Sequence, residues 1–213
     1  MKVLLICQFY GDLDVSEDYM PYFRSLQENT IKGFVTVSIW GGQTPNSEWE
    51  FLTNNSMAFM PYMTIPYQQF IREESPSLAN VLKAQGYTAN VIHPWNGSGY
   101  RRNTVYPLLG FDSFKSIEDF NYEDFEYIRT YPTDLSIYKQ LINQYEKRDP
   151  DKNFFNFTIT MQNHSGYDLP GLESTIFVGD DHKYPRLEQY LTLLKDSDDS
   201  LKYLIDYFNM VVN

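Results

Sequence analysis

Apolar residues form two kinds of pattern along this chain, and the two kinds alternate. Short runs of apolar or β-branched residues occupy Val3 to Gln8, Ile31 to Ile39, Tyr87 to His93 and Asn153 to Met161. Runs of this kind are typical of strands that are buried on both faces in a parallel sheet. Between them, apolar residues recur every three or four positions, as they do along one face of a helix. Strands that alternate with helices predict right-handed crossovers and a mainly parallel sheet.

Residues that cap or stop helices mark where the predicted helices begin and end. Serine and threonine are favoured just before a helix, proline in its first turn and glycine just after its end. The prediction is an α/β fold: a three-layer α/β/α sandwich with a mainly parallel sheet, in one domain over residues 1–213. The predicted helices cover Asp18–Glu28, a segment starting at Thr44, Ser75 to Gly86, Thr133 to Asp149 and a segment starting at Ser197. An ordered loop is predicted over Met57–Gln69 and an irregular connection over Phe114–Tyr131.

The composition fits one well-buried domain and excludes several kinds of partner. The 213 residues are 42% hydrophobic and 17% aromatic, which is enough for a core and unlike a disordered segment. The net charge of −11, with a pI near 4.6, argues against nucleic-acid binding and against adhesion to an anionic membrane through basic patches. The single cysteine, Cys7, excludes a disulfide within the chain. No apolar run reaches the length of a membrane span, and Met1–Ile6 is expected to begin a strand rather than a signal peptide.

Thr44 follows a strand and a glycine turn and stands at the predicted start of a helix. Gly41 and Gly42 let the backbone turn sharply, and Pro45 is favoured at the first helical position, so Thr44 is predicted to be the N-cap. The free amides and the dipole of a helix N-terminus stabilise negative charge. A hydroxyl there can become an alkoxide nucleophile or carry a transferred phosphate. The alternative is that Thr44 only caps its helix.

The segment from Gly41 to Thr53 reads G-G-Q-T-P-N-S-E-W-E-F-L-T, and the pattern continues to Gln69. It resembles the nucleophile segment of the lipoteichoic acid synthase family, which comprises phosphoglycerol transferases of the sulfatase and alkaline phosphatase superfamily. The resemblance implies an alkaline-phosphatase-like fold, of which this chain would supply the first part of the catalytic domain. It also implies that Thr44 is the nucleophile and touches the metal ion.

Two loops that follow predicted strands carry candidate substrate-binding residues. The first holds His93, Trp95, Tyr100 and Arg102, a combination that can bind a phosphate monoester and its glycerol, because arginine pairs with phosphate oxygens and aromatic faces cover carbon atoms. The alternative is a polar loop with Trp95 folded onto the core. By the resemblance, these four residues contact the glycerol phosphate head group. The phrase T-M-Q-N-H-S-G-Y-D around His164 is similar to the second substrate-binding histidine motif of that family.

The metal site that the resemblance implies, for manganese or magnesium, departs from the family pattern in this chain. Gln8 stands where the family has a metal-binding glutamate, and a neutral amide is a poorer ligand for a hard cation. The stretch from Gly179 to His182 imitates the family's late Gly-Asp-His motif but precedes the last helix instead of following it. We therefore expect weak or absent metal binding, with Thr44 and Gln8 as the matched ligand positions.

The resemblance thus implies a phosphoglycerol transferase in which Thr44 takes glycerol phosphate from a phosphatidylglycerol-type lipid and passes it to a polymer or glycan. The isolated chain is expected to be inactive. The sequence does not decide whether a second polypeptide completes the site. By the resemblance, the expected location is the extracellular face of the cell membrane. One alternative is a non-catalytic remnant or substrate-binding module; another is a sulfatase- or phosphatase-like hydrolase. Threonine in place of the Cys or Ser of ordinary sulfatases argues against a sulfatase.

Overall fold

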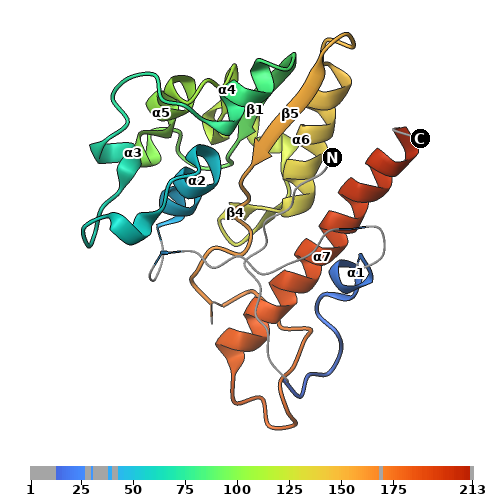
Figure 1. Cartoon of the computed structure of the whole chain (residues 1–213). Coiled ribbons are helices and arrows are strands. Elements are labelled where there is room, and N and C mark those ends of the chain that lie inside the picture. The colour runs from blue at the N-terminus through green and yellow to red at the C-terminus, as the bar shows by residue number, and fades with distance from the viewer. Residues whose placement is uncertain (1–12, 27–29, 31–37, 40–42, 168–169, 212–213) are drawn as a thin grey trace.

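A computed structural model of the chain describes residues 13–26, 30, 38–39, 43–167 and 170–211 (Figure 1). The predicted strand Val3–Gln8 and most of the predicted strand Ile31–Ile39 lie outside the described residues. The helices are α1 (Pro21–Ser25), α2 (Thr44–Thr53), α3 (Pro66–Gln69), α4 (Leu78–Lys83), α5 (Arg102–Leu108), α6 (Asp134–Glu146) and α7 (Pro185–Val211). The strands are β1 (Tyr87–Ile92), β2 (Ser113–Lys115), β3 (Tyr127–Ile128), β4 (Tyr131–Pro132) and β5 (Asn153–Thr158), and short 3₁₀ turns include η1 (Met57–Phe59) and η2 (Gly99–Arg101).

The central described sheet contains β2, β1 and β5 in that order, and both strand pairs are parallel. In the longer pair, Tyr87 lies opposite Asn153 and Ile92 opposite Thr158, so the two strands run side by side over their whole length. The strands β3 and β4 form a separate antiparallel hairpin. The predicted α/β fold with a parallel sheet is confirmed.

Helices cover both faces of this sheet (Figure 1). Successive side chains of a strand point to opposite faces, so Ala89 and Val91 face one side and Ile92 the other. Ala89 and Val91 belong to an apolar cluster with residues of α2, α4 and α5, whereas Ile92 packs with Ile137 and Leu141 of α6. The helix α7 packs in turn against α6. The arrangement is therefore the predicted three-layer α/β/α sandwich.

Two of the predicted helix starts follow from serine and threonine caps. The Thr133 hydroxyl accepts a hydrogen bond from the Ser136 backbone N–H, and α6 begins at the next residue, as predicted. The Ser77 hydroxyl accepts one from the Asn80 backbone N–H, so α4 begins two residues after the predicted Ser75-Pro76 start. Each hydroxyl satisfies an amide that the first helical turn leaves without a partner.

The last helix was predicted to start at Ser197, and this prediction is wrong: α7 already begins at Pro185. A serine followed by two aspartates is typical of a helix start, but here these side chains bond other segments from the middle of the helix. The Asp198 carboxylate accepts the backbone N–H groups of Tyr22 and Phe23 in the first turn of α1. The Ser197 hydroxyl donates to Asp134. Although α7 is long, no helix in the described part of the chain is both long and apolar enough to cross a membrane.

Candidate active site

The chain leaves the carboxyl ends of β1 and β5 at the same edge of the sheet, next to the end of β2. The His93 backbone N–H donates to the Lys115 carbonyl just beyond the register of β1 and β2, at 2.9 Å. The Ile159 N–H donates to the Ile92 carbonyl, also at 2.9 Å. Loops at this edge of an open parallel sheet are where such folds bind ligands. The loops that carry His93 and His164 therefore start side by side.

Three side chains meet beyond this edge and form an aromatic cluster of Trp95, Tyr131 and His164. The ring centroids of Trp95 and Tyr131 lie 5.2 Å apart, and those of Tyr131 and His164 lie 5.4 Å apart. The Tyr131 hydroxyl lies 3.1 Å from His164 Nδ1, within hydrogen-bond distance. Trp95 is 41% exposed, so it is not folded onto the core as the alternative had it. Tyr131, in the hairpin β3–β4, thus connects two predicted site residues that lie far apart in sequence.

Arg129 of the same hairpin fixes the loop that carries His164. Its guanidinium donates to the carbonyl oxygens of Gln162 at 2.6 Å, His164 at 3.2 Å and Gly166 at 2.7 Å. The guanidinium also lies over the ring of Tyr131, 5.3 Å from the centroid. One planar group that bonds three backbone carbonyl oxygens restricts the loop more than a single ammonium would. Sequence reasoning missed this residue and Tyr131, because the segment has no periodic pattern and its partners lie more than thirty residues away.

His93 is buried beneath this cluster and is 2% exposed. Burial, and then the positive charge of nearby Arg102, lower the pKa of His93 to about 3, against the smaller opposing effect of a hydrogen bond to the Ile159 backbone. The imidazole is therefore neutral at pH 7. Its Nδ1 is buried without a hydrogen-bond partner within the described residues. A buried polar atom without a partner is costly, so this nitrogen is a position at which a ligand group would be stabilised.

Arg102 lies in a different environment from the open head-group site in which it was expected. It is 3% exposed, and its Nη2 and Nε bond the two carboxylate oxygens of Glu48 at 2.5 Å and 3.2 Å. The Tyr106 hydroxyl also donates to Glu48, at 2.8 Å. Although burial works against the charge, the Glu48 carboxylate raises the pKa of Arg102 overall. The pair links α5 to α2, and this structural role was not visible in the sequence because the two residues are 54 positions apart.

The backbone before Arg102 is in a conformation that side chains rarely adopt. Tyr100 has φ of 53° and Arg101 φ of 62°, both in the left-handed region. Two successive residues of this kind cost free energy, and such strain is concentrated at functional sites. The conformation brings the Tyr100 ring over the Arg102 guanidinium, 5.1 Å from its centroid. Tyr100 therefore contacts the buried ion pair, while its expected contact with a head group stays a prediction.

Thr44 was predicted to be the N-cap of α2 but is its first residue, so the helix begins one position earlier than predicted. The N-cap is Gln43, which adopts a left-handed conformation with φ of 65° and makes no capping bond through its side chain. The Asn46 side chain instead donates to the Gln43 side chain at 3.2 Å and to the Thr64 carbonyl at 3.0 Å. Thr44 thus lies in the first turn, where the helix dipole favours negative charge. Through Glu48 and Arg102, the helix that carries it is tied to the loop that carries His93.

The described residues do not supply a metal-binding donor set. Among residues 13–26, 30, 38–39, 43–167 and 170–211, no three His, Cys, Asp or Glu side chains gather in a way that could hold a metal ion. Gln8, the expected ligand position besides Thr44, lies outside the described residues. The stretch from Gly179 to His182 makes contacts within the protein: His182 lies 3.7 Å from Glu188, and the Gly179 N–H donates to the Asp14 carbonyl.

Comparisons with known proteins identify relatives over most of the chain. The family model described as Sulfatase matches residues 7–211. A Rhizobium meliloti protein named "Putative cyclic beta-1,2-glucan modification protein" is 39% identical over 198 residues, which is 91% of this chain and 30% of that protein. The capsular polysaccharide biosynthesis protein RkpI of the same organism is 29% identical over 128 residues, or 60% of this chain and 22% of that protein.

Solved structures with the same fold include a lipoteichoic acid synthase and a phosphoglycerol transferase. The lipoteichoic acid synthase LtaP of Listeria monocytogenes has a TM-score of 0.73 and 26% identity, and 90% of this chain matches 46% of that one. The phosphoglycerol transferase GacH of Streptococcus pyogenes, in complex with sn-glycerol-1-phosphate, has a TM-score of 0.78 and 22% identity, covering 94% of this chain and 53% of that one. The chain therefore spans about half the length of these structures. The match to the family model extends over nearly all of its length, and the chain belongs to the sulfatase family.

Proposed function

We propose that this chain forms the nucleophile-bearing part of a phosphoglycerol transferase of the lipoteichoic acid synthase type. The observation that carries the proposal is the aromatic cluster, in which Tyr131 joins Trp95 and His164 from the loops after two neighbouring strands. Buried His93 lies at the end of the first of these strands. An aromatic face can cover the glycerol carbons, while imidazole nitrogens hydrogen-bond phosphate oxygens. The similarity to LtaP supports the same class of chemistry.

The proposed reaction proceeds in two displacements at phosphorus. Thr44 Oγ1 attacks the phosphorus of a phosphatidylglycerol-type donor, the bond to the diacylglycerol oxygen breaks, and that oxygen leaves with a proton. Glycerol phosphate is then bonded to Thr44 at the N-terminus of α2, where the helix dipole stabilises its charge. A hydroxyl of the acceptor then attacks the same phosphorus, the bond between phosphorus and Thr44 Oγ1 breaks, and the proton of the acceptor hydroxyl passes to Thr44 Oγ1. The relative named for cyclic glucan modification favours a glycan as the acceptor.

A second candidate function is a binding module that holds glycerol phosphate without transferring it. Gln8 in place of a carboxylate favours this candidate, and so does the lack of a metal-binding cluster in the part of the chain that the structure describes. A threonine hydroxyl is a weak nucleophile at neutral pH unless it is activated. Since His93 and His164 are assigned to the head group, we expect this chain alone to bind the head group and to turn over slowly or not at all.

The two candidates are separated by measuring binding and covalent transfer in the same preparation. Titration calorimetry with sn-glycerol-1-phosphate should show saturable binding that is weakened about tenfold in His164→Ala, the size expected for one lost hydrogen bond to a charged group. His182→Ala, which removes an exposed histidine elsewhere, is the matched control and should bind like the wild type.

Transfer is detected as a glycerol phosphate adduct on Thr44 by mass spectrometry after incubation with a phosphatidylglycerol donor and manganese. An adduct that is absent in Thr44→Ala supports the transferase, and binding without an adduct supports the binding module. Release of free glycerol phosphate to water without an acceptor would instead identify a hydrolase. No binding at all, or equal binding by wild type and His164→Ala, would contradict both proposals.

A further inference from the structure

An apolar loop, defined here as Met57–Ile71, protrudes between α2 and α4. It contains η1 and α3, and four of its large apolar side chains face water: Phe59, Tyr62, Met63 and Phe70. Phe59 is 89% exposed and Tyr62 is 90% exposed, which are the highest values among the large apolar side chains that the structure describes. Single exposed apolar residues are common, but a cluster of this kind marks a surface that contacts an apolar partner.

The loop is also the part of the sequence that is most free of charge. From Phe51 to Ile71 there is no Asp, Glu, Lys or Arg, and no other stretch of this length without them occurs in the chain, whose net charge is −11. A protein partner that binds by charge complementarity would find no charged group here. A hydrocarbon surface, by contrast, is entered at lowest free-energy cost by a segment without charged side chains.

The structure fixes the loop next to the candidate active site. The Thr64 carbonyl accepts the Asn46 side chain, two residues after Thr44, at 3.0 Å, and the Thr64 side chain is buried. Farther along, the Tyr67 carbonyl accepts Arg101 Nη1 at 3.2 Å, next to the strained backbone before the buried ion pair. The exposed side chains are therefore displayed from a loop that is anchored on both the nucleophile helix and the head-group loop.

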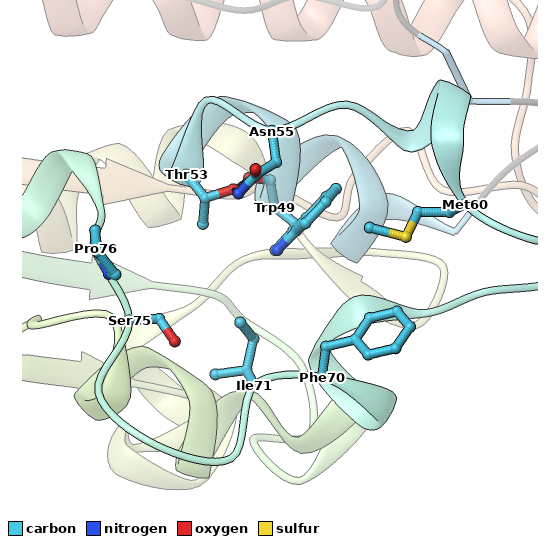
Figure 2. Close-up of a pocket in the computed structure, with 8 residues that line it drawn as sticks. All are labelled: Trp49, Thr53, Asn55, Met60, Phe70, Ile71, Ser75 and Pro76. Atoms are coloured by element: carbon cyan, nitrogen blue, oxygen red, sulfur yellow. Dashed lines mark hydrogen bonds between the residues drawn. The ribbon is translucent and has the colours of Figure 1, made fainter.

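A pocket of about 440 Å³ opens behind the loop (Figure 2). In Figure 2, Met60 and Phe70 of the loop lie at one end, Trp49 and Ile71 face each other in the middle, and Pro76 lies at the other end. The remaining lining residues, Thr53, Asn55 and Ser75, are polar but uncharged. Because Met60, Phe70 and Ile71 belong to both features, the mainly apolar pocket adjoins the exposed loop. Such a pocket suits a hydrocarbon chain and offers nothing to balance a charged ligand.

We propose that the apolar loop enters the surface of a lipid bilayer and that the pocket takes up part of an acyl chain of the donor lipid. This inference rests on the proposed function for the identity of the donor, but not for the contact with lipid itself. An acidic protein gains no attraction from an anionic membrane, so the contact depends on burial of apolar side chains. The loop thereby holds the lipid head group at the level of Thr44.

The test is co-sedimentation of the chain with vesicles of phosphatidylcholine, with and without phosphatidylglycerol. The test variant is Phe59→Ser, Tyr62→Ser and Met63→Ser combined. The control is Val81→Ser, Tyr184→Ser and Met210→Ser combined, which removes three exposed apolar side chains from α4 and from the two ends of α7. We expect the wild type and the control to bind both kinds of vesicle, with about a tenfold loss in the test variant. Raising the salt concentration should not weaken binding, because charge does not drive it.

Three results would overturn the inference: no vesicle binding by the wild type, equal binding by the test variant, or binding that salt abolishes. A wild-type dimer that becomes a monomer in the test variant would also overturn it, since the loop would then be a protein interface. Titration with sn-glycerol-1-phosphate separates this inference from the proposed function. Vesicle binding without glycerol phosphate binding rejects the proposed function alone, and the reverse result rejects the lipid contact alone.

Discussion

His93 and His164 lie in loops that follow neighbouring strands, β1 and β5, but their environments are opposite. His93 is buried, uncharged at pH 7, and lies near the positive charge of Arg102. His164 is exposed to water, with its ring held by Tyr131 and its backbone by Arg129. The difference teaches that two similar sequence motifs need different support. His93 is buried near an ion pair, whereas His164 is held by residues of the β3–β4 hairpin.

The largest change is expected from removing the support of the buried histidine. Glu48→Gln takes the carboxylate away from Arg102, so that a positive charge is left buried without its partner. Breaking a buried ion pair from one side typically costs about 3–5 kcal/mol of unfolding free energy. Urea unfolding measures this loss. Glu126→Gln, which breaks an exposed contact with Lys139, is the control and should change stability by less than about 1 kcal/mol. Similar losses in both variants would show that the buried pair has no special role.

A smaller effect is expected from removing the support of the exposed histidine. Arg129→Ala deletes the bonds to the carbonyl oxygens of Gln162, His164 and Gly166, at a cost of about 2–3 kcal/mol. Arg129→Lys should recover only part of it, because a lysine cannot reach all three acceptors with a planar group. Hydrogen exchange of the His164 loop distinguishes this role from a general packing role. Exchange should accelerate there and stay unchanged in α4; uniform acceleration would contradict local positioning.

The pH dependence of stability tests the environment of the buried histidine directly. Because the pKa of His93 is lowered to about 3 in the folded state, the unfolded chain binds a proton there below about pH 6.5 and the folded chain does not. The His93 contribution is therefore favourable above pH 6.5 and is lost as the pH falls from there towards 3. Between pH 7 and pH 5 the loss is about 2 kcal/mol. His93→Gln should remove this part of the pH dependence; an unchanged slope in that variant would assign the dependence to other groups.

The smallest effect is expected from removing the Tyr131 hydroxyl, which bonds the ring of His164. Tyr131→Phe keeps the ring between Trp95 and His164 but removes the hydrogen bond to His164 Nδ1. A single exposed hydrogen bond contributes about 1 kcal/mol, so the free energy of unfolding should fall by no more than that. The affinity for sn-glycerol-1-phosphate should fall about fivefold if the bond orients the ring of His164. An unchanged affinity would reduce Tyr131 to a packing role.

The elements that sequence could predict are those whose signals are local. The strands at Tyr87–Ile92 and Asn153–Thr158 follow from short apolar runs, and the start of α6 follows from its Thr133 cap. The start of α7 was missed because Ser197 and Asp198 resemble a helix cap, while their partners lie in other segments. Side chains whose position depends on distant partners are invisible to such reasoning.

The candidate site shows the same division. The position of His93, Trp95 and His164 after strands whose carboxyl ends meet at one edge of the sheet could be predicted. Arg129 and Tyr131 could not, since the irregular segment that carries them shows no period. The burial of Arg102 also depends on Glu48, far away in the sequence. The expected ligand position Gln8 lies outside the described residues. The substrate roles of all the other candidate residues stay predictions: Thr44, His93, Trp95, Tyr100, Arg102 and His164.

The most direct test of the central claim is nuclear magnetic resonance of the indole N–H of Trp95 and the ring of His164 during titration with sn-glycerol-1-phosphate. If the carboxyl edge of the sheet binds this head group, both signals should shift with one shared dissociation constant, while the ring signals of His182 stay in place. Shifts that are absent, or that affect His182 as strongly as His164, would contradict the account.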